Sequence, residues 1–351
     1  MSVVRNIRID GVEVNDGTDC YIIAEIGNNH QGDIELCKKM FNTAKDCGAT
    51  AVKLQKRDNK ELFCKALYNS PYNSEHTFGK TYGQHRDFLE LDRDQYKELI
   101  DHAKQIGITL FATAFDFPSA DFLADLDMPA FKLASGDLTN TPLLKHIAGF
   151  NKPMIISTGG ADMADIRRAY AAVSPINKQI VLLQCTAGYP PAWEELNLNV
   201  IRTLRDEFPD VVVGLSSHDS GIAMSLVAYC LGARMIEKHF TLNRAMQGTD
   251  HAFSLEHSGL RKLVRDLQRA RISMGDGIKR SYASEEKPLY KMGKKLVAAH
   301  AISKGSALRL EDIAIRSPND GLPPYEIDNV IGKTLNRDLA EDENISFNDL
   351  V

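Results

Sequence analysis

The feature that most constrains the fold is a repeat in which a short apolar segment is followed by a helical pattern, eight times over. The apolar segments, which we predict to be strands, span residues 21–25, 51–55, 108–113, 130–134, 153–157, 180–185, 211–215 and 234–239. Strands that alternate with helices form parallel sheets. Eight such units in roughly 250 residues predict a closed (β/α)8 TIM barrel. An open doubly wound sheet is the alternative, although the first strand lacks the following G-x-G-x-x-G of a dinucleotide fold.

The barrel pattern ends with a helix predicted over residues 258–274, and the chain then changes character. Residues 276–291 are rich in polar residues and predict a linker, whereas residues 292–351 contain short strands and turns. We therefore predict a barrel domain at 1–275, a linker at 276–291 and a small domain at 292–351. A domain of about 60 residues is marginally stable alone, so we expect it to pack on the barrel or on a second subunit. Residues 56–92 lack periodicity and predict a long functional loop.

Composition excludes several classes of function. The net charge is −5 and no long basic run occurs, so nucleic acid is not an expected partner. The six cysteines are scattered without a C-x-x-C pair, which indicates reduced thiols and a cytoplasmic location. We expect no signal peptide and no membrane association, because no apolar run approaches the ~20 residues of a membrane span.

Polar side chains follow every predicted strand at its carboxyl end. They are Glu25; Lys53 and Gln55; Thr113; Lys132, Ser135 and Asp137; Ser157 and Thr158; Gln184 and Thr186; Ser216 and His218; and Glu237 and His239. Buried charges of this kind are costly unless they are paired or serve a ligand. Because TIM-barrel active sites lie at this end of the strands, the pattern predicts a binding site.

Two histidines end neighbouring predicted strands. His218 and His239 are separated by one strand–helix unit, so we expect their rings to share one space. Imidazole suits Mn, Fe, Co or Zn, and two imidazoles leave coordination positions open for a Lewis-acid role. The alternative is a pair of hydrogen-bonded histidines, since metal spacing rules are firm only for denser clusters. Glu237 and Asp250 nearby favour the metal.

The two lysines predict an anion site. Lys53 and Lys132 can act as point charges for a phosphate or carboxylate group. The alternative is that they form structural salt bridges with Glu25 and Asp137. Those two carboxyl groups are also candidates for acid–base catalysis.

Several motifs, taken together and in order, resemble the sialic acid synthase family. They lie at residues 24–32, 132–137, 157–159, 184–190 and 237–241. The C-terminal domain resembles the antifreeze-like (SAF, β-clip) domain of that family. The resemblance implies an enzyme that condenses phosphoenolpyruvate with an open-chain N-acetylmannosamine-type sugar, giving a nine-carbon 2-keto acid and phosphate.

The resemblance also implies roles for single residues. His218 and His239 would hold a divalent metal, Mn²⁺ or Mg²⁺. Phosphoenolpyruvate would be seated by Lys53, Lys132, Ser135 and Ser157, with Gln55 and Thr113 nearby. Catalysis would use Glu25, acting on the attacking water or leaving proton, and Asp137. The sugar would be contacted by Tyr189, by Asp250 and by Arg316 from a partner subunit, which implies a domain-swapped homodimer.

The acceptor sugar stays open at this point. Asp137 and the loop at residues 78–86 resemble the animal-like branch, which uses the sugar 6-phosphate, and Lys80, His85 and Arg86 are candidates for binding a second phosphate. Ser217, where bacterial relatives often have Asp, is a further difference. The candidates are N-acetylmannosamine, its 6-phosphate, mannose 6-phosphate and a bacterial diamino sugar, giving N-acetylneuraminate, its 9-phosphate, or a deaminoneuraminate- or legionaminate-type product. A non-catalytic sugar-binding or ice-binding relic and a metal-dependent aldolase or hydrolase are the competing hypotheses.

Overall fold

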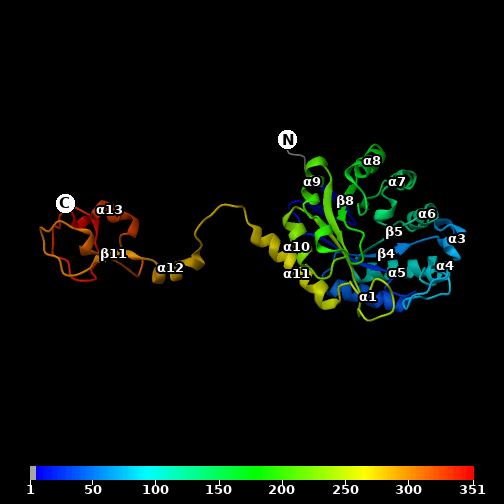
Figure 1. The fold of residues 1–351 in the computed structure, drawn as a ribbon, viewed down its shortest axis with the longest axis horizontal. Helices are drawn as coiled ribbons and strands as arrows, with labels where there is room; N and C mark the ends of the chain where they lie inside the picture. Colours follow the sequence, from blue (N-terminus) through cyan, green and yellow to red (C-terminus); the bar gives the residue numbers. More distant parts are fainter. Residues whose placement is uncertain (1–4) are drawn as a thin grey trace. The chain divides into compact units, whose positions relative to one another are not determined.

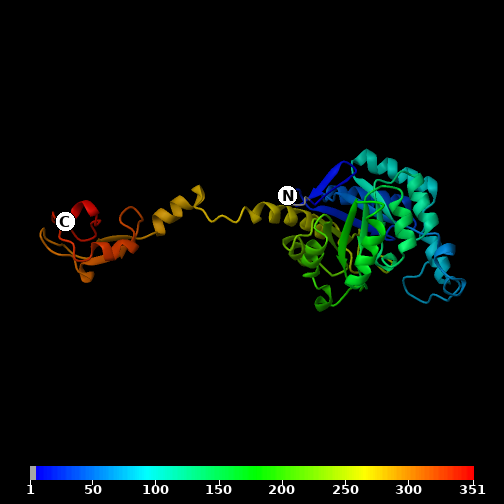
Figure 2. The same ribbon diagram turned by 90° about the horizontal axis from the view of Figure 1, so that it is seen from above.

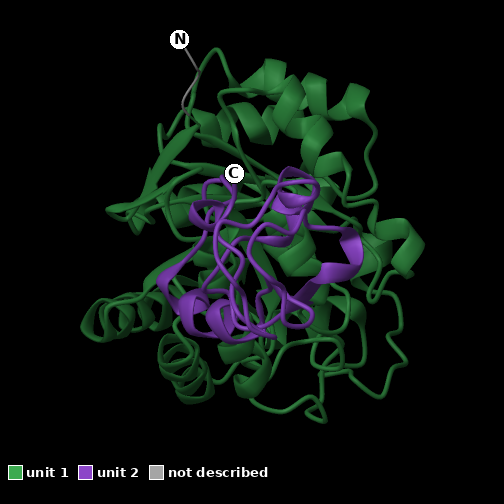
Figure 3. Ribbon diagram, turned by 90° about the vertical axis from the view of Figure 1, so that its left-hand side faces the viewer, with its two compact units in different colours: residues 1–275 green, residues 276–351 purple. Residues whose placement is uncertain are grey.

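The computed structural model describes residues 5–351, which divide into two compact units (Figure 1). The first unit ends at Gly275 and the second runs from Asp276 to Val351 (Figure 3). Each unit is described by itself below. Within residues 5–351, no helix combines the length and the apolar character needed to cross a bilayer.

The first unit is a closed barrel of eight parallel strands surrounded by helices (Figures 1 and 2). The strands are β3 (Tyr21–Gly27), β4 (Ala51–Lys56), β5 (Thr109–Ala114), β6 (Phe131–Leu133), β7 (Met154–Ser157), β8 (Ile180–Cys185), β9 (Val212–Ser217) and β10 (Met235–His239). They pair in chain order, and β10 closes the barrel by pairing with β3, so that His239 lies opposite Glu25. The predicted TIM barrel is confirmed, and the open sheet is excluded.

Several of the surrounding helices begin at side-chain caps that the sequence carries. The surrounding helices are α1 (Ile34–Asp46), α5 (Arg93–Ile106), α6 (Phe117–Asp125), α7 (Thr141–Ala148), α8 (Met163–Val173), α9 (Val200–Glu207), α10 (Ala223–Cys230) and α11 (His257–Met274). Asp33 caps α1 by accepting hydrogen bonds from two backbone N–H groups of its first turn. Asp92 and Gln95 form a capping box at the start of α5, which ends at Gly107 in the left-handed conformation.

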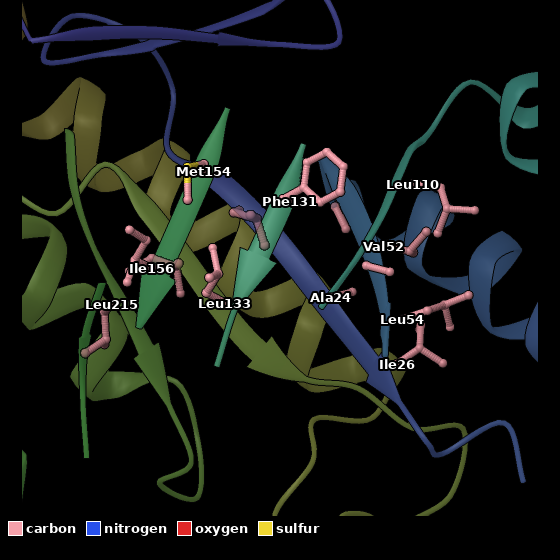
Figure 4. Packing of buried hydrophobic residues seen from close by; sticks show 14 of the residues in the cluster. Ala24, Ile26, Val52, Leu54, Leu110, Phe131, Leu133, Met154, Ile156 and Leu215 are labelled. Atoms are coloured by element: carbon pink, nitrogen blue, oxygen red, sulfur yellow. The ribbon is translucent and has the colours of Figure 1, made fainter. Parts of the chain in front are cut away.

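Outward-facing strand residues form the main hydrophobic core against the helices (Figure 4). Ala24 and Ile26 of β3 and Val52 and Leu54 of β4 alternate with residues that face the barrel interior. Each fully buried Val, Leu or Ile side chain of this layer contributes about 1.5–3 kcal/mol relative to exposure. This layer holds the strands in place, and therefore also the side chains on their inner face.

The interior of the barrel changes from apolar to polar along each strand. At the amino ends it holds a second cluster: Ile7, Ile9, Val14, Tyr21, Ile23, Ala51, Phe111, Ala130, Ile155, Val181, Leu183, Val212 and Met235. Because strand side chains alternate between faces, the next inward positions after Ile23, Phe111 and Ile155 are Glu25, Thr113 and Ser157. The strands thus close one end of the barrel with apolar side chains and leave polar groups at the other.

An antiparallel hairpin precedes the barrel, in a segment for which no element is predicted above. It consists of β1 (Asn6–Ile9) and β2 (Val12–Asn15). Ile7, Ile9 and Val14 belong to the interior cluster, so the hairpin seals the apolar end of the barrel. Charged or polar and apolar residues alternate at 6–9, as in a half-buried strand. A strand of four residues is nevertheless too short to be predicted from such alternation.

The segment at residues 56–92 is more ordered than predicted. It contains three short helices, α2 (Asn59–Leu62), α3 (Lys65–Tyr68) and α4 (Tyr82–Phe88), instead of a continuous loop. Aromatic contacts join them, with the rings of Phe63 and Tyr82 5.0 Å apart. Helices of one or two turns carry too few residues to show a 3.6-residue period.

The second unit has a small core of its own. Two antiparallel strands, β11 (Lys295–Ala298) and β12 (Ile313–Arg316), and a short helix, α13 (Ile327–Val330), enclose apolar side chains that include Leu296, Leu308 and Leu335. The segment at 276–291, predicted as a linker, contains a 3-10 turn at Ala283–Glu285 and most of helix α12 (Glu286–Met292). The second half of the predicted linker is therefore helical.

Candidate active site

A cavity of ≈ 460 Å³ opens at the carboxyl ends of the barrel strands. Each of the eight strands contributes at least one side chain to its lining, from Glu25 of β3 to His239 of β10. This is the end of a TIM barrel at which active sites lie. The strand-end pattern in the sequence therefore corresponds to one concave site.

Most of the residues predicted for the site line this cavity. They are Glu25, Lys53, Gln55, Thr113, Lys132, Ser135, Ser157, Tyr189, His218, His239 and Asp250. Asp137 and Arg316 are not among the lining residues. The structure thus brings together side chains that are separated by more than 200 positions in the sequence.

Asp137 lies beside the cavity in the 3-10 turn Ser135–Asp137. Its Oδ1 is 3.4 Å from Nδ2 of Asn140, and burial raises the pKa of its carboxyl group to about 6. The alternative of an ion pair between Lys132 and Asp137 is wrong, because Lys132 contacts other groups. A catalytic role for Asp137 stays a prediction that its position does not support.

Arg316 belongs to β12 of the second unit. Its guanidinium group is half exposed and forms an ion pair with Asp342, with Nε 2.9 Å from Oδ1. Its predicted role in the site of a partner subunit stays a prediction.

The two lysines lie at the buried end of the cavity. Nζ of Lys53 lies 2.6 Å from Oε2 of Glu25 and donates to Oγ1 of Thr113 at 2.7 Å. Nζ of Lys132 donates to Oγ of Ser157 at 2.7 Å. The alternative of an ion pair between Lys53 and Glu25 is therefore confirmed. Two ammonium groups and two hydroxyl groups nevertheless face one cavity, a donor set that suits a phosphate or carboxylate ligand.

A second buried carboxylate lies between the lysines. Oε1 of Glu237 is 3.8 Å from Nζ of Lys53 and 3.9 Å from Nζ of Lys132. Burial alone would raise its pKa, but the charges of the lysines hold that pKa below its ordinary value. For Glu25, burial is the larger effect and raises the pKa to about 7. Two carboxyl groups with oppositely shifted pKa values are suited to different roles, Glu237 as a fixed charge and Glu25 as a proton carrier.

The two histidines meet at the cavity as predicted. The ring centroids of His218 and His239 are 5.4 Å apart. Nδ1 of His218 lies 3.1 Å from the carbonyl oxygen of Thr186, an arrangement that leaves Nε2 free to act as a ligand. Nδ1 of His239 is buried without a hydrogen-bond partner and lies 3.7 Å from Oδ2 of Asp250. Burial lowers the pKa of both rings, that of His218 to about 4, so both are neutral at pH 7.

These side chains fit a divalent cation with open coordination positions. Neutral imidazole is the form that binds metals, and the buried Nδ1 of His239 and Oε2 of Glu237 both lack hydrogen-bond partners. Residues 5–351 contain no group of three or more His, Cys, Asp or Glu arranged to hold a metal ion. Any metal here would therefore take its remaining ligands from water or substrate.

Several lining residues were missed or left outside the predicted site. Asn28, Arg57, Phe115, Ala134, Cys185 and Thr249 were missed. Ser216 and Glu237 were noted only as polar strand ends, Glu237 also as a neighbour favouring a metal, and Arg86 was considered only for a second phosphate. Strand alternation could have found some of them, since Gln55 and Arg57 follow Lys53 in steps of two residues. Phe115 and Thr249 lie on loops, for which no such pattern exists.

A buried ion pair holds the loop that carries His218. Nζ of Lys238 lies 2.9 Å from Oδ1 of Asp219, the residue after His218, and both side chains are almost fully buried. Lys238 also donates to the backbone carbonyl of Asp219, and Ser217 donates to its carboxylate. The outward face of β10 thus fixes the loop that carries one of the two histidines.

We expect Lys238→Met to lower the free energy of unfolding by about 3–5 kcal/mol, because Asp219 would remain buried without its partner. Urea denaturation followed by circular dichroism measures this loss. The double variant Lys238→Met/Asp219→Asn should recover part of it. A loss below about 1 kcal/mol would show that the pair does not hold the loop.

Comparisons with known proteins decide the family. The NeuB family model matches residues 40–279, and the SAF domain model matches residues 295–351. The chain belongs to the NeuB family. The resemblance to sialic acid synthases with a C-terminal SAF domain is therefore confirmed.

Individual relatives of this NeuB protein agree with the family model. The N-acetylneuraminate-9-phosphate synthase of Mus musculus is 40% identical over 327 residues, which is 93% of this chain and 91% of the relative. The N,N'-diacetyllegionaminic acid synthase of Campylobacter jejuni is 39% identical over 326 residues, covering 92% and 97% of the two chains. A crystal structure of N-acetylneuraminic acid synthetase from Leptospira borgpetersenii, in complex with citrate, superimposes with a TM-score of 0.71 at 30% identity, covering 81% of this chain and 95% of that one.

Proposed function

We propose that this NeuB protein condenses phosphoenolpyruvate with an N-acylmannosamine-type aldose, giving N-acetylneuraminate, its 9-phosphate or a related nonulosonic acid, together with phosphate. The observation that carries the proposal is the joining of two donor sets in one cavity. Lys53 and Lys132 provide a seat for an anion, and His218 and His239 lie on its wall. The names of the relatives support this class of product.

Phosphoenolpyruvate would bind at the lysine end. Its phosphate and carboxylate groups carry the negative charge that Lys53 and Lys132 can neutralise, and the hydroxyl groups of Thr113, Ser135 and Ser157 add donors. The enclosed position strengthens these interactions because little water competes with them. The same groups can stabilise the phosphate as it leaves.

The acceptor would bind toward the histidines. We propose that His218 and His239 hold Mn²⁺ or Mg²⁺; when bound, the metal polarises a carbonyl oxygen as a Lewis acid. Tyr189 packs against the ring of His218 with centroids 4.1 Å apart, and Asp250 lies beside His239. These two side chains can therefore contact a sugar bound there.

Glu25 is the proton carrier that we propose. With a pKa near 7 it is partly protonated and partly ionised at neutral pH. Lys53 and Gln55 orient it, with Nε2 of Gln55 2.8 Å from Oε1. We propose that its ionised form takes a proton from the water that adds to C2 of phosphoenolpyruvate while C3 bonds to the aldehyde carbon.

Phosphate release tests the proposed reaction. Purified protein, phosphoenolpyruvate and Mn²⁺ should release phosphate only when an N-acylmannosamine-type aldose is added, and a chelator should stop the release. The panel comprises N-acetylmannosamine, its 6-phosphate, mannose 6-phosphate and a diacetylated diamino sugar. Absence of release with every acceptor would favour a sugar-binding protein without activity, and release from phosphoenolpyruvate without any sugar would favour a hydrolase.

The second unit provides a separate test. We propose a cytoplasmic homodimer in which Arg316 completes the partner's site, as the family resemblance implies. Arg316→Ala should raise the apparent KM for the sugar about tenfold, a loss typical of one charge-assisted hydrogen bond, without dissociating the dimer. Steady-state kinetics and analytical ultracentrifugation measure the two properties, and Arg309→Ala on the same unit is the control. An unchanged KM would remove Arg316 from the site.

A further inference from the structure

Beyond the lysine end, the cavity contains two arginines that have no acidic partner. Arg57 and Arg86 both line it, and neither forms an ion pair with Asp or Glu within 4.0 Å anywhere in residues 5–351. Other guanidinium groups, such as that of Arg93, which pairs with Asp125 at 3.0 Å, do have such partners. Two unpaired guanidinium groups in one cavity indicate a ligand that supplies the missing negative charge.

Arg57 is the stronger indication because it is buried. It is 8% exposed, its guanidinium carbon lies 3.7 Å from the ring centroid of Phe115, and Nη2 donates to Oε1 of Gln55 at 2.7 Å. Nη1 is buried and has no hydrogen-bond partner. A buried charged donor without a partner is costly. One edge of a rigid, aromatic-stacked fork is thus free to bind an anion.

Arg86 adds a second positive charge from α4. Its Nε donates to the hydroxyl group of Tyr82 at 3.1 Å, so the side chain is held by a neutral group. Of the three residues that the sequence suggested for a second phosphate, only Arg86 lines the cavity; Lys80 does not. Burial lowers the pKa of His85 to about 4, so His85 is neutral and supplies no charge.

Arg57 lies away from the proposed phosphoenolpyruvate seat. Lys53, Gln55 and Arg57 follow one another at two-residue steps, each of which advances about 6.6 Å in an extended strand. A chain of contacts connects them, from Lys53 through Glu25 and Gln55 to Arg57. Glu25 and Gln55 thus stand between Lys53 and Arg57 in this chain of contacts, and Arg57 is displaced along the strand toward the mouth.

We infer that Arg57 and Arg86 form a binding subsite for a phosphate monoester at the far end of the acceptor sugar, so that the preferred acceptor is a phosphorylated aldose. This inference rests on the proposed function. The planar fork of Arg57 matches phosphate geometry better than a lysine would. Phosphoenolpyruvate does not need these groups, because Lys53 and Lys132 already serve its charges.

The test compares acceptors in matched variants. For Arg57→Gln we expect kcat/KM with N-acetylmannosamine 6-phosphate to fall on the order of 100-fold, as for loss of one buried charged partner. With unphosphorylated N-acetylmannosamine the loss should be at least about tenfold smaller, and reflects only the lost hydrogen bond to Gln55; KM for phosphoenolpyruvate should stay within about twofold. Arg57→Lys should retain part of the activity, and Arg86→Gln should show a smaller loss of the same selectivity. Arg93→Gln, whose partner is Asp125 outside the cavity, is the control.

Binding without turnover separates this inference from the proposed reaction. Calorimetric titration of N-acetylmannosamine 6-phosphate, with no phosphoenolpyruvate present, should show tighter binding than N-acetylmannosamine, and Arg57→Gln should remove the difference. A wild-type protein that does not distinguish the two sugars overturns the subsite, even if it releases phosphate. Equal losses with both acceptors, or a raised KM for phosphoenolpyruvate, would also overturn it. If no acceptor supports phosphate release but the phosphorylated sugar still binds more tightly than the unphosphorylated one, the proposed reaction is wrong and the proposed subsite is retained.

Discussion

Lys132→Met is expected to reduce kcat/KM for phosphoenolpyruvate by roughly 10²–10³-fold, the loss typical of removing one preorganised donor from an active site. Nζ of Lys132 donates to Oγ of Ser157 and to the backbone carbonyl of Leu133, which fixes the ammonium group inside the cavity. Burial lowers the pKa of this lysine, while the nearby carboxylate of Glu237 opposes that shift. Methionine has a similar length but provides neither charge nor donors. Steady-state kinetics with varied phosphoenolpyruvate measure the change.

The control for this substitution is Lys152→Met. Lys152 is partly exposed and pairs with Asp127 at 2.8 Å, away from the cavity, so activity should be retained. Thermal unfolding of Lys132→Met shows whether the loss has a structural origin, since Glu237 would keep only Lys53 as a cationic neighbour within 4.0 Å among residues 5–351. A folded Lys132→Met variant with near-normal kcat/KM would remove Lys132 from the anion seat.

His239→Ala is expected to lower turnover by at least about 10³-fold while leaving the barrel folded. Its ring is buried, neutral and, at Nδ1, without a hydrogen-bond partner, so no other group is positioned to replace it. Loss of one of two imidazole ligands should also abolish tight Mn²⁺ binding, because the remaining ligands would be His218 and water. Calorimetric titration with Mn²⁺ measures binding independently of activity.

His102→Ala is the matched control for this prediction. His102 lies outside the cavity and contacts Oδ1 of Asn42 at 2.9 Å, so both activity and Mn²⁺ binding should be retained. Unchanged Mn²⁺ affinity in a folded His239→Ala variant would overturn the assignment of the two histidines as a metal site. In that case the alternative of two histidines without a metal would hold.

The barrel could be predicted from the sequence because its periodicity is local and repeated. Each strand is an apolar segment of three to seven residues, and several helices carry their own caps, as Asp33 and Asp92 show. The hairpin β1–β2 and the short helices between β4 and α5 were not predicted, because segments of four residues carry no measurable period. Their structure depends on tertiary contacts, such as that of Ile9 with the barrel interior.

The candidate site was only partly accessible from the sequence. The polar residue at each strand end is visible as a break in an apolar segment, and this was sufficient to find Lys53, Lys132, His218 and His239. The same pattern included Asp137, which the structure places beside the cavity. In a strand, the alternation of side chains fixes the face to which each residue points. Asp137 lies in a turn after its strand, where no such alternation fixes the direction of the side chain.

The sequence by itself determined the architecture, the family and the end of the barrel at which the polar side chains gather. Only the tertiary structure decided which charges compensate one another: Glu25 with Lys53, Glu237 between two lysines, and Arg57 with no acidic partner among residues 5–351. The physical reason is that the pattern of one strand specifies the face on which a side chain lies, while its charge partner comes from another strand. The strength of that pairing depends on burial, which only the closed barrel creates.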